Sequence, residues 1–233
     1  MFEPVATIDA HEKYGLPFAF VDDGETLLTG GFDGSLAAWT VPEGEQIASG
    51  DGHDRSVNCG GVTADGRLAT GSTDTSVRLW TLPDLDPDGT FAGHTDTLAG
   101  MATHPEESTV CSASYDTTVR SWDAGSGESL RVYEGHPRNV TVVAFLADGA
   151  TVVSGGLGGE ALVWDLDDDA PVATLPGHGD AVVGIDRTPG GEVVTVGYDG
   201  VVRSWDPTDW SEGLAVDLPA DATPSGLAVA ADD

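Results

Sequence analysis

The sequence predicts an all-β fold made of repeated four-stranded units, and three observations support that prediction. Five tryptophans recur at intervals of 41 or 42 residues, and each follows a histidine by 27 or 28 residues. Four of these histidines come directly after a glycine, whereas the first follows Ala10. A period of about 40–45 residues with Gly-His near its start and Trp near its end is typical of a β-propeller blade. We therefore expect a β-propeller of four-stranded antiparallel blades, with five complete blades and an incomplete sixth.

The third copy of the repeat, which begins at Gly93-His94, shows the expected strands most clearly. Its β-rich runs are separated by short segments of turn residues, which is typical of antiparallel strands. The strands are expected, in order, in a run through Leu98 and Met101 and then over residues 109–114, 118–122 and 128–133. The other copies follow the same plan and contain Asp-Gly or Gly-Gly turns, which favour hairpins.

The repeat runs from one end of the sequence to the other, so we expect one domain over residues 1–233. The repeats cover about 1–40, 41–81, 82–123, 124–165 and 166–206, followed by a partial copy over 207–233. A sheet of four short strands buries its faces only against neighbouring sheets, so the copies are expected to pack radially.

The incomplete sixth blade leaves the closure of the ring open. Residues 3–8 and 213–218 each resemble a fourth strand, and residues 225–230 resemble a first strand, but no middle strands are left to join them. Three arrangements are therefore expected as alternatives: a truncated six- or seven-bladed protein, a five-bladed ring with a displaced tail, or one part of an assembly completed by another chain. Because unpaired strand edges invite association, we expect self-association through the open sixth blade or pairing with another chain.

Charge is the second informative property of the sequence. Forty acidic residues face nine basic ones, the formal net charge is −31, and Lys13 is the only lysine. Binding to nucleic acid or to an anionic membrane requires clustered Lys and Arg, so neither partner is expected. Carboxylate repulsion opposes compaction in dilute buffer and is screened at molar salt. The composition resembles that of halophilic archaeal proteins; an acidic mesophilic protein is the alternative.

The sequence also bears on the compartment in which the protein works. No run of about 18 apolar residues is present, and the N-terminus has neither a basic start nor a long apolar stretch. Cys59 and Cys111 lie in expected strands of different repeats, where they are typical of small buried residues in a reducing compartment. We therefore expect a cytoplasmic protein.

The repeat resembles that of the WD-repeat β-propeller family over essentially the whole chain. Three Trp-Asp dipeptides, at Trp122, Trp164 and Trp205, match the dipeptide that names the family, whereas Trp39 and Trp80 are followed by threonine. The resemblance implies a hydrogen-bonded network of His, Ser or Thr, Asp and Trp in each blade. The networks would be His11, Thr29, Asp33 and Trp39; His53, Thr70, Asp74 and Trp80; His94, Ser112, Asp116 and Trp122; His136, Ser154 and Trp164; and His178, Thr195, Asp199 and Trp205. In the fourth copy Gly158 stands where the acid is expected, so that blade should be less rigid or His136 should find another acceptor.

Two chemical functions, hydrolysis by the repeated networks and calcium binding by an acidic segment, are disfavoured by the sequence pattern. A hydrolase needs one Ser-His-Asp set, whereas here the set recurs with a Trp in every copy, which indicates a structural role. Residues 84–89 match the opening of a calcium loop, but Thr95 stands at the twelfth position, where a carboxylate is needed. We expect a solvated loop there, no metal site and no cofactor.

The remaining candidate for function is the surface. In proteins of the resembling family, partners usually dock on the narrow face, where the residue before each network Asp and the loop after each Gly-His lie. In this chain these positions give Tyr14, Phe32, Arg55, Thr73, Thr97, Tyr115, Arg138, Leu157 and Tyr198, with Asn139 and Ala181 in the same loops. Aromatic and Arg side chains are enriched at binding hot spots. We therefore expect a non-catalytic protein-protein interaction scaffold; the alternatives are a propeller that binds a small ligand or cation and a truncated array without independent function.

Overall fold

The computed structural model describes residues 7–229 and contains twenty β-strands in five four-stranded antiparallel sheets. In each sheet the four strands are joined in chain order, as the sequence predicts. The sheets contain β1 Gly15–Val21, β2 Thr26–Gly31, β3 Ser35–Thr40 and β4 Gln46–Asp51; β5 Val57–Val62, β6 Leu68–Ser72, β7 Ser76–Trp80 and β8 Pro87–Ala92; β9 Leu98–Thr103, β10 Thr109–Ser114, β11 Thr118–Asp123 and β12 Ser129–Glu134; β13 Val140–Phe145, β14 Thr151–Gly156, β15 Ala161–Asp165 and β16 Ala173–Leu175; and β17 Val182–Arg187, β18 Val193–Gly197, β19 Val201–Trp205 and β20 Glu212–Asp217. The part of the chain that the structure describes has no α-helix, only the short 3-10 turn η1 over Asp22–Gly24.

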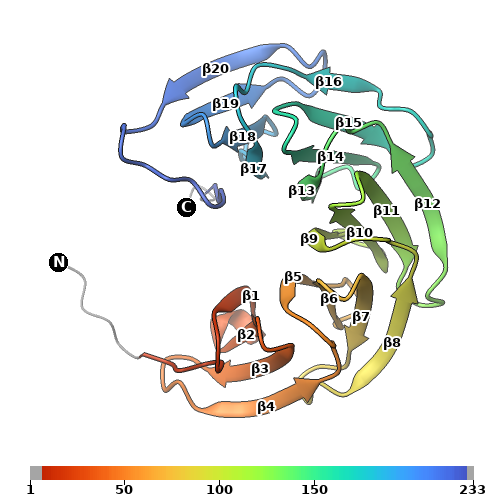
Figure 1. Ribbon diagram of the computed structural model, residues 1–233, viewed down its shortest axis with the longest axis vertical. Helices are drawn as coiled ribbons and strands as arrows, with labels where there is room; N and C mark the ends of the chain where they lie inside the picture. The colour runs from red at the N-terminus through yellow and green to blue at the C-terminus, as the bar shows by residue number, and fades with distance from the viewer. Residues whose placement is uncertain (1–6, 230–233) are drawn as a thin grey trace.

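The five sheets stand around a common centre like the blades of a propeller (Figure 1). The first strand of each sheet, β1, β5, β9, β13 or β17, lies innermost, and the fourth lies on the outside. Inner strands of neighbouring sheets pack against one another in chain order, from β1 on β5 to β13 on β17. Figure 1 also shows that the arc is open between the first and fifth sheets.

The hydrophobic core is divided among the four interfaces between consecutive sheets. One cluster joins Leu28 and Leu36 of the first sheet to Trp80 of the second, and another joins Phe91 of the second to Trp122 of the third. The remaining two clusters repeat this arrangement with Trp164 and Trp205. Each of these indoles is at most 2% exposed and packs against the preceding sheet, so the regular tryptophan spacing marks the recurring interfaces.

The strands expected near the two ends of the chain have different outcomes. The strand expected over residues 213–218 is confirmed as β20, the fourth strand of the fifth sheet. The expected strand over residues 3–8 lies mostly outside the described residues, and residues 7 and 8 are not in a strand. The strand expected over 225–230 is wrong for its described part, because residues 225–229 have no strand conformation. Without a middle strand beside it, this segment lacks the partner that a β-ladder requires.

Candidate functional site

The third blade contains a continuous chain of hydrogen bonds that links its core to its loops. The Trp122 Nε1–H donates to Ser112 Oγ at 2.8 Å, and Ser112 Oγ lies 2.8 Å from His94 Nε2. His94 Nδ1 lies 2.8 Å from Asp116 Oδ2, which also accepts the Thr95 backbone N–H at 3.0 Å. Because the carboxylate only accepts, His94 must carry a proton on Nδ1, and Nε2 of the neutral ring accepts the Ser112 hydroxyl proton. Ser112 is fully buried, so each polar group in this hydrogen-bond network needs a hydrogen-bonding partner.

The second, fifth and first blades carry related networks. In the second, His53 bridges Thr70 and Asp74 at 2.8 Å each. In the fifth, His178 lies 2.8 Å from Thr195 Oγ1 and 3.0 Å from the nearer oxygen of Asp199. The first differs, because His11 Nδ1 lies 2.9 Å from Ser35 Oγ and 3.7 Å from Asp33. The indoles complete these networks, since Trp39, Trp80 and Trp205 donate to Thr29, Thr70 and Thr195.

The fourth blade keeps the inner half of the network without the acid. Trp164 Nε1–H donates to Ser154 Oγ at 2.7 Å, and His136 Nε2 lies 2.7 Å from the same oxygen. Gly158 occupies the acid position, and the carboxylate of Glu160 fills part of the space, since a Cβ on Gly158 would lie 2.6 Å from Glu160 Oε2. Burial without a facing carboxylate lowers the pKa of His136 to about 4.

Sequence reasoning missed a further hydroxyl in three of these networks. Ser35, Ser76 and Thr118 each donate both a backbone N–H and a side-chain O–H to the carboxylate two residues earlier, with O–O distances of 2.6–2.7 Å. Burial alone would raise the pKa of Asp116, but the hydrogen bonds from Thr95, Thr118 and His94 together lower it to about 2. The fixed offset of two residues after the Asp is the sequence signal that could have identified these hydroxyls.

The network geometry holds structure together and does not expose a nucleophile. Ser112, Ser154, Thr70 and Thr195 are all 0% exposed, and each hydroxyl oxygen contacts both an indole N–H and an imidazole nitrogen. A substrate carbonyl therefore has no route to these oxygens. Within residues 7–229 no group of three or more His, Cys, Asp or Glu side chains is placed to hold a metal ion. Residues 84–89 do not form a solvated loop, because β8 begins at Pro87, Asp88 pairs with Arg67 at 3.0 Å and Leu85 is buried.

The loops named as a partner-binding face lie side by side at one end of each sheet. In all five blades the N–H of the residue before the network acid, or before Gly158, donates at 2.9 Å to the carbonyl of the loop residue three after the network His. These pairs are Phe32 with Tyr14, Thr73 with Ser56, Tyr115 with Thr97, Leu157 with Asn139 and Tyr198 with Ala181. In the second blade the expected Arg55 directly precedes the paired residue.

The side chains on these loops differ in how far they reach into solvent. Tyr14 is 81% exposed and Tyr198 is 56% exposed, whereas Phe32, Tyr115 and Leu157 are about 40% exposed. Tyr14 and Phe32 form an edge-to-face pair with ring centroids 6.0 Å apart. Arg55 and Arg138 are exposed. Thr73 is half-buried and its hydroxyl accepts from Asn58, and Ala181 is only 1% exposed, so these two residues contribute least to this surface.

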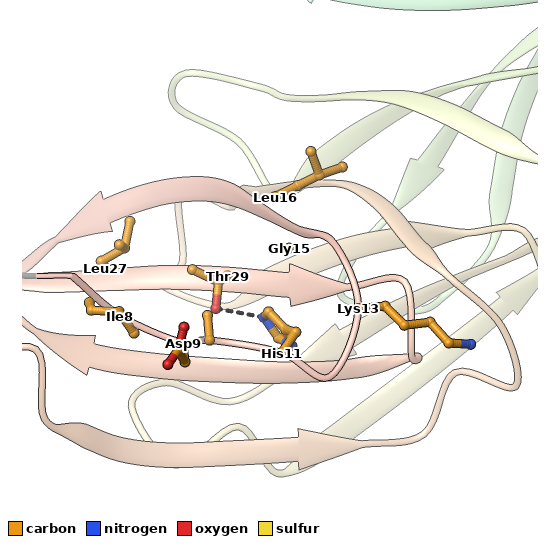
Figure 2. Close-up of a pocket in the computed structure, with 9 residues that line it drawn as sticks. Ile8, Asp9, His11, Lys13, Gly15, Leu16, Leu27 and Thr29 are labelled. Atoms are coloured by element: carbon orange, nitrogen blue, oxygen red, sulfur yellow. Dashed lines mark hydrogen bonds between the residues drawn. The ribbon is translucent and has the colours of Figure 1, made fainter.

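Two pockets lie close to these features. Figure 2 shows the first, about 430 Å³, beside the first network; Ile8, Leu16 and Leu27 line it, and the Lys13 side chain points away from Ile8 and Leu27. The second, about 340 Å³, lies among the inner strands and is lined by residues of β1, β5, β9, β13 and β17 together with Ser225. Leu27 is only half-buried, whereas its counterparts Leu68, Val110, Val152 and Val193 are fully buried, so the first pocket marks a sheet face without a preceding neighbour.

Comparison with known proteins identifies one family. Four segments of the chain match the family model described as WD domain, G-beta repeat, over residues 44–81, 85–123, 127–165 and 169–206. The segments cover β4–β7, β8–β11, β12–β15 and β16–β19, so each begins with the fourth strand of one sheet and ends with the third strand of the next. Together they cover more than half of the chain. A search of curated proteins found no match.

Proposed function

The chain belongs to the WD-repeat family, and we propose that it acts as a non-catalytic scaffold whose protein partner docks on the narrow face formed by the paired loops. One observation carries this proposal: the equivalent loops of four of the five sheets present an exposed Tyr, Phe or Leu side chain at the same end of the sheet. Large apolar side chains held on rigid loops are typical of binding hot spots. The hydrogen bond between each loop pair limits the ordering cost of binding.

A pull-down from a salt-matched native extract tests the proposal. The parent is compared with a variant in which Tyr14, Phe32, Tyr115 and Tyr198 are replaced by alanine. A matched control replaces Ile47, Leu130 and Val172, which are about half exposed on outer strands or in a loop. We expect a partner that both the parent and the control retain and that the face variant loses while it remains folded. Retention of the partner by the face variant would contradict the proposal.

Net charge and the two cysteines support two narrower parts of the proposal, a salt requirement for folding and a cytoplasmic location. The net charge of −31 favours a protein that needs molar salt to fold, because screening removes the repulsion among its carboxylates. Cys59 and Cys111 are buried free thiols, and burial raises the pKa of Cys59 to about 12, which fits a reducing cytoplasm. No helix within the described residues is long and apolar enough to cross a membrane.

Salt dependence has a direct test. We expect circular dichroism in dilute buffer to show a reduced β signal and a broad melt, both restored by molar potassium chloride. A full β spectrum with a sharp melt in dilute buffer would contradict the halophilic interpretation. The same titration with sucrose in place of salt separates charge screening from general exclusion effects.

A second candidate function rests on the central pocket. Leu16, Phe18 and Met101 line it together with the polar Asn58 and Thr141, which suits a small ligand with both apolar and polar groups. Such a ligand would raise the melting temperature with the logarithm of its concentration once that concentration exceeds Kd. A screen of such small amphiphilic ligands without any shift would remove this candidate and leave the scaffold.

A further inference from the structure

Within residues 7–229, the fifth sheet has one face that no other sheet covers. We call the apolar part of this face, Val202, Leu214 and Val216, the β20 strip. Val216 is 44% exposed and Leu214 is 58% exposed. The strand registers place Val216 at the position of Gly50, Phe91, Tyr133 and Leu175 in the other sheets, and all four are buried. Val202 is half-buried, whereas its counterparts Leu36, Val77, Val119 and Ala161 are at most 1% exposed. The β20 strip therefore lacks a cover that the same positions have in the other four sheets.

The four complete interfaces show what such a cover consists of. At the second interface Trp122 stacks on Phe91 with ring centroids 5.9 Å apart and planes 26° apart. At the third, Trp164 packs on Tyr133 at 5.6 Å. In both cases the indole comes from the third strand of the following sheet, and an apolar residue of its second strand, Val110 or Val152, completes the cluster. The middle two strands of a blade are thus the part that covers this position.

The inner part of the same face is already occupied by the C-terminal segment of the chain. A Cβ on Gly184 of β17 would lie 2.7 Å from Leu227 Cβ, so Leu227 packs directly on this strand. The Val229 backbone N–H donates to Asp186 Oδ2 at 2.6 Å. At the second interface Leu98, from the inner strand of the third sheet, packs in a similar way beside Gly71. Residues 225–229 therefore stand where the inner strand of a sixth sheet would stand.

We propose that the β20 strip is a docking site for a two-stranded β-hairpin of another chain, with an indole on its second strand. Such a hairpin supplies the missing middle strands, because its first strand can pair with residues 225–229 and its indole can lie on Val216. It continues the interface that already recurs four times between the sheets of this chain. A complete second copy fits less well, because the inner strand of its first sheet would need the space that residues 225–229 occupy. The site is separate from the loop face proposed above, so either can fail without the other.

A peptide made from the chain's own middle hairpin, residues 107–124, is the probe. Cys111 is replaced by alanine, and added terminal cysteines close the peptide by a disulfide, which orders it before binding. The labelled peptide is titrated with the 233-residue chain in molar salt, and fluorescence anisotropy is recorded. We expect saturable one-to-one binding that weakens at least tenfold when the peptide carries Trp122→Ala or the chain carries Val216→Asp.

Three comparisons make the result decisive. Leu130→Asp is the matched control, because Leu130 is 54% exposed on an outer strand whose sheet is covered by its neighbour; it should bind the peptide as the parent does. The variant with the four aromatic residues of the loop face replaced should also bind normally. No binding at millimolar peptide, or equal binding by Val216→Asp, would overturn the proposal. So would a dimer in sedimentation velocity that Val216→Asp dissociates and the peptide does not, because a second copy would then cover the strip.

Discussion

The third and fourth blades share the same Trp-Ser-His chain but end it differently, and the difference separates two tasks within the network. Both indoles donate to a buried serine, and both serines lie within 2.8 Å of a histidine Nε2. Only the third blade continues to a carboxylate, Asp116, because the fourth has Gly158 at that position. Trp164 is nevertheless as well buried as Trp122. The acid is therefore not needed to place the indole between the sheets.

The acid instead fastens the loop above the histidine. Asp33, Asp74, Asp116 and Asp199 each accept the backbone N–H of the residue after the network His. In the fourth blade that residue is Pro137, which has no N–H to donate. The loss of the acceptor at Gly158 thus coincides with the loss of the donor, and the fourth loop carries no unsatisfied N–H at this point. Because donor and acceptor are lost together, the fourth blade keeps its fold without an acid.

The separation between placing the indole and fastening the loop is tested first by removing the indoles, which should have the largest effect on stability. We expect Trp122→Ala and Trp164→Ala each to lower the free energy of unfolding by about 3–5 kcal/mol, because each leaves a cavity between two sheets. The two losses should be similar, since the indoles are equally buried whether or not an acid is present. Guanidinium denaturation followed by circular dichroism measures both, with the half-buried Trp210→Ala as a milder control. A much smaller loss for Trp164→Ala would show that the acid does help to hold the indole.

The next effect is the response of the fourth blade to acid. The pKa of His136 is lowered to about 4 in the folded protein. Between about pH 6.5 and pH 4, His136 therefore binds a proton in the unfolded chain but not in the folded one. Stability from this group is therefore full above about pH 6.5 and falls by about 3 kcal/mol as the pH drops to about 4. Burial also lowers the pKa of His94, but the bond to Asp116 opposes that shift. Histidine NMR should show His136 titrating at lower pH than His94, and the reverse order would contradict the role given to the acid.

Removal of the acid from the third blade is expected to cost less. Asp116→Ala leaves the Thr95 N–H, the Thr118 hydroxyl and His94 Nδ1 without an acceptor, which should cost about 1–3 kcal/mol. Because the pKa of Asp116 is lowered to about 2, its contribution is present above about pH 4 and is lost as the pH falls toward 2. Glu160→Ala is the matched change in the fourth blade and should lie within about 0.5 kcal/mol of the parent. Equal losses for both variants, measured at pH 7, would remove the distinction between the blades.

Much of this architecture could be predicted from the sequence because the same pattern of residues occurs in five copies. The strand over Thr109–Ser114 and the indole positions follow from a period that local propensity alone would not reveal. The break at Gly158 was also visible as a departure from the pattern. Its partner Pro137 was not, since nothing in the sequence says that the N–H after the histidine bonds the acid. That contact joins residues about twenty positions apart and depends on how two loops meet.

The ends of the chain could be predicted less well for a related physical reason. A strand over residues 225–230 was expected from its apolar pattern, but a strand needs a neighbour, and pattern alone cannot supply one. The surface residues show a similar limit at Thr73. Its position in the repeat matches that of Tyr115 and Tyr198, yet its hydroxyl bonds to Asn58 and its side chain is half-buried. Repeat position predicts which loop a residue joins, whereas its exposure depends on the side chains that contact it, here Asn58 of the same blade.

The smallest effect is expected from rebuilding the acid in the fourth blade. Gly158→Asp with Glu160→Thr copies Asp116 and Thr118, and it removes the carboxylate that the new Cβ would meet. The variant should gain only about 1 kcal/mol, because a bond to His136 and the partly exposed bonds within the new Asp-Thr pair form while Pro137 still has no N–H to offer. The pKa of His136 should rise, which makes the loss of stability between pH 6.5 and 4 smaller than in the parent. Adding Pro137→Thr should then bring a further gain that Pro137→Thr alone does not give, since the donor is useful only with its acceptor. If the two changes prove additive in a double-mutant cycle, the coupling of Pro137 to Gly158 is wrong.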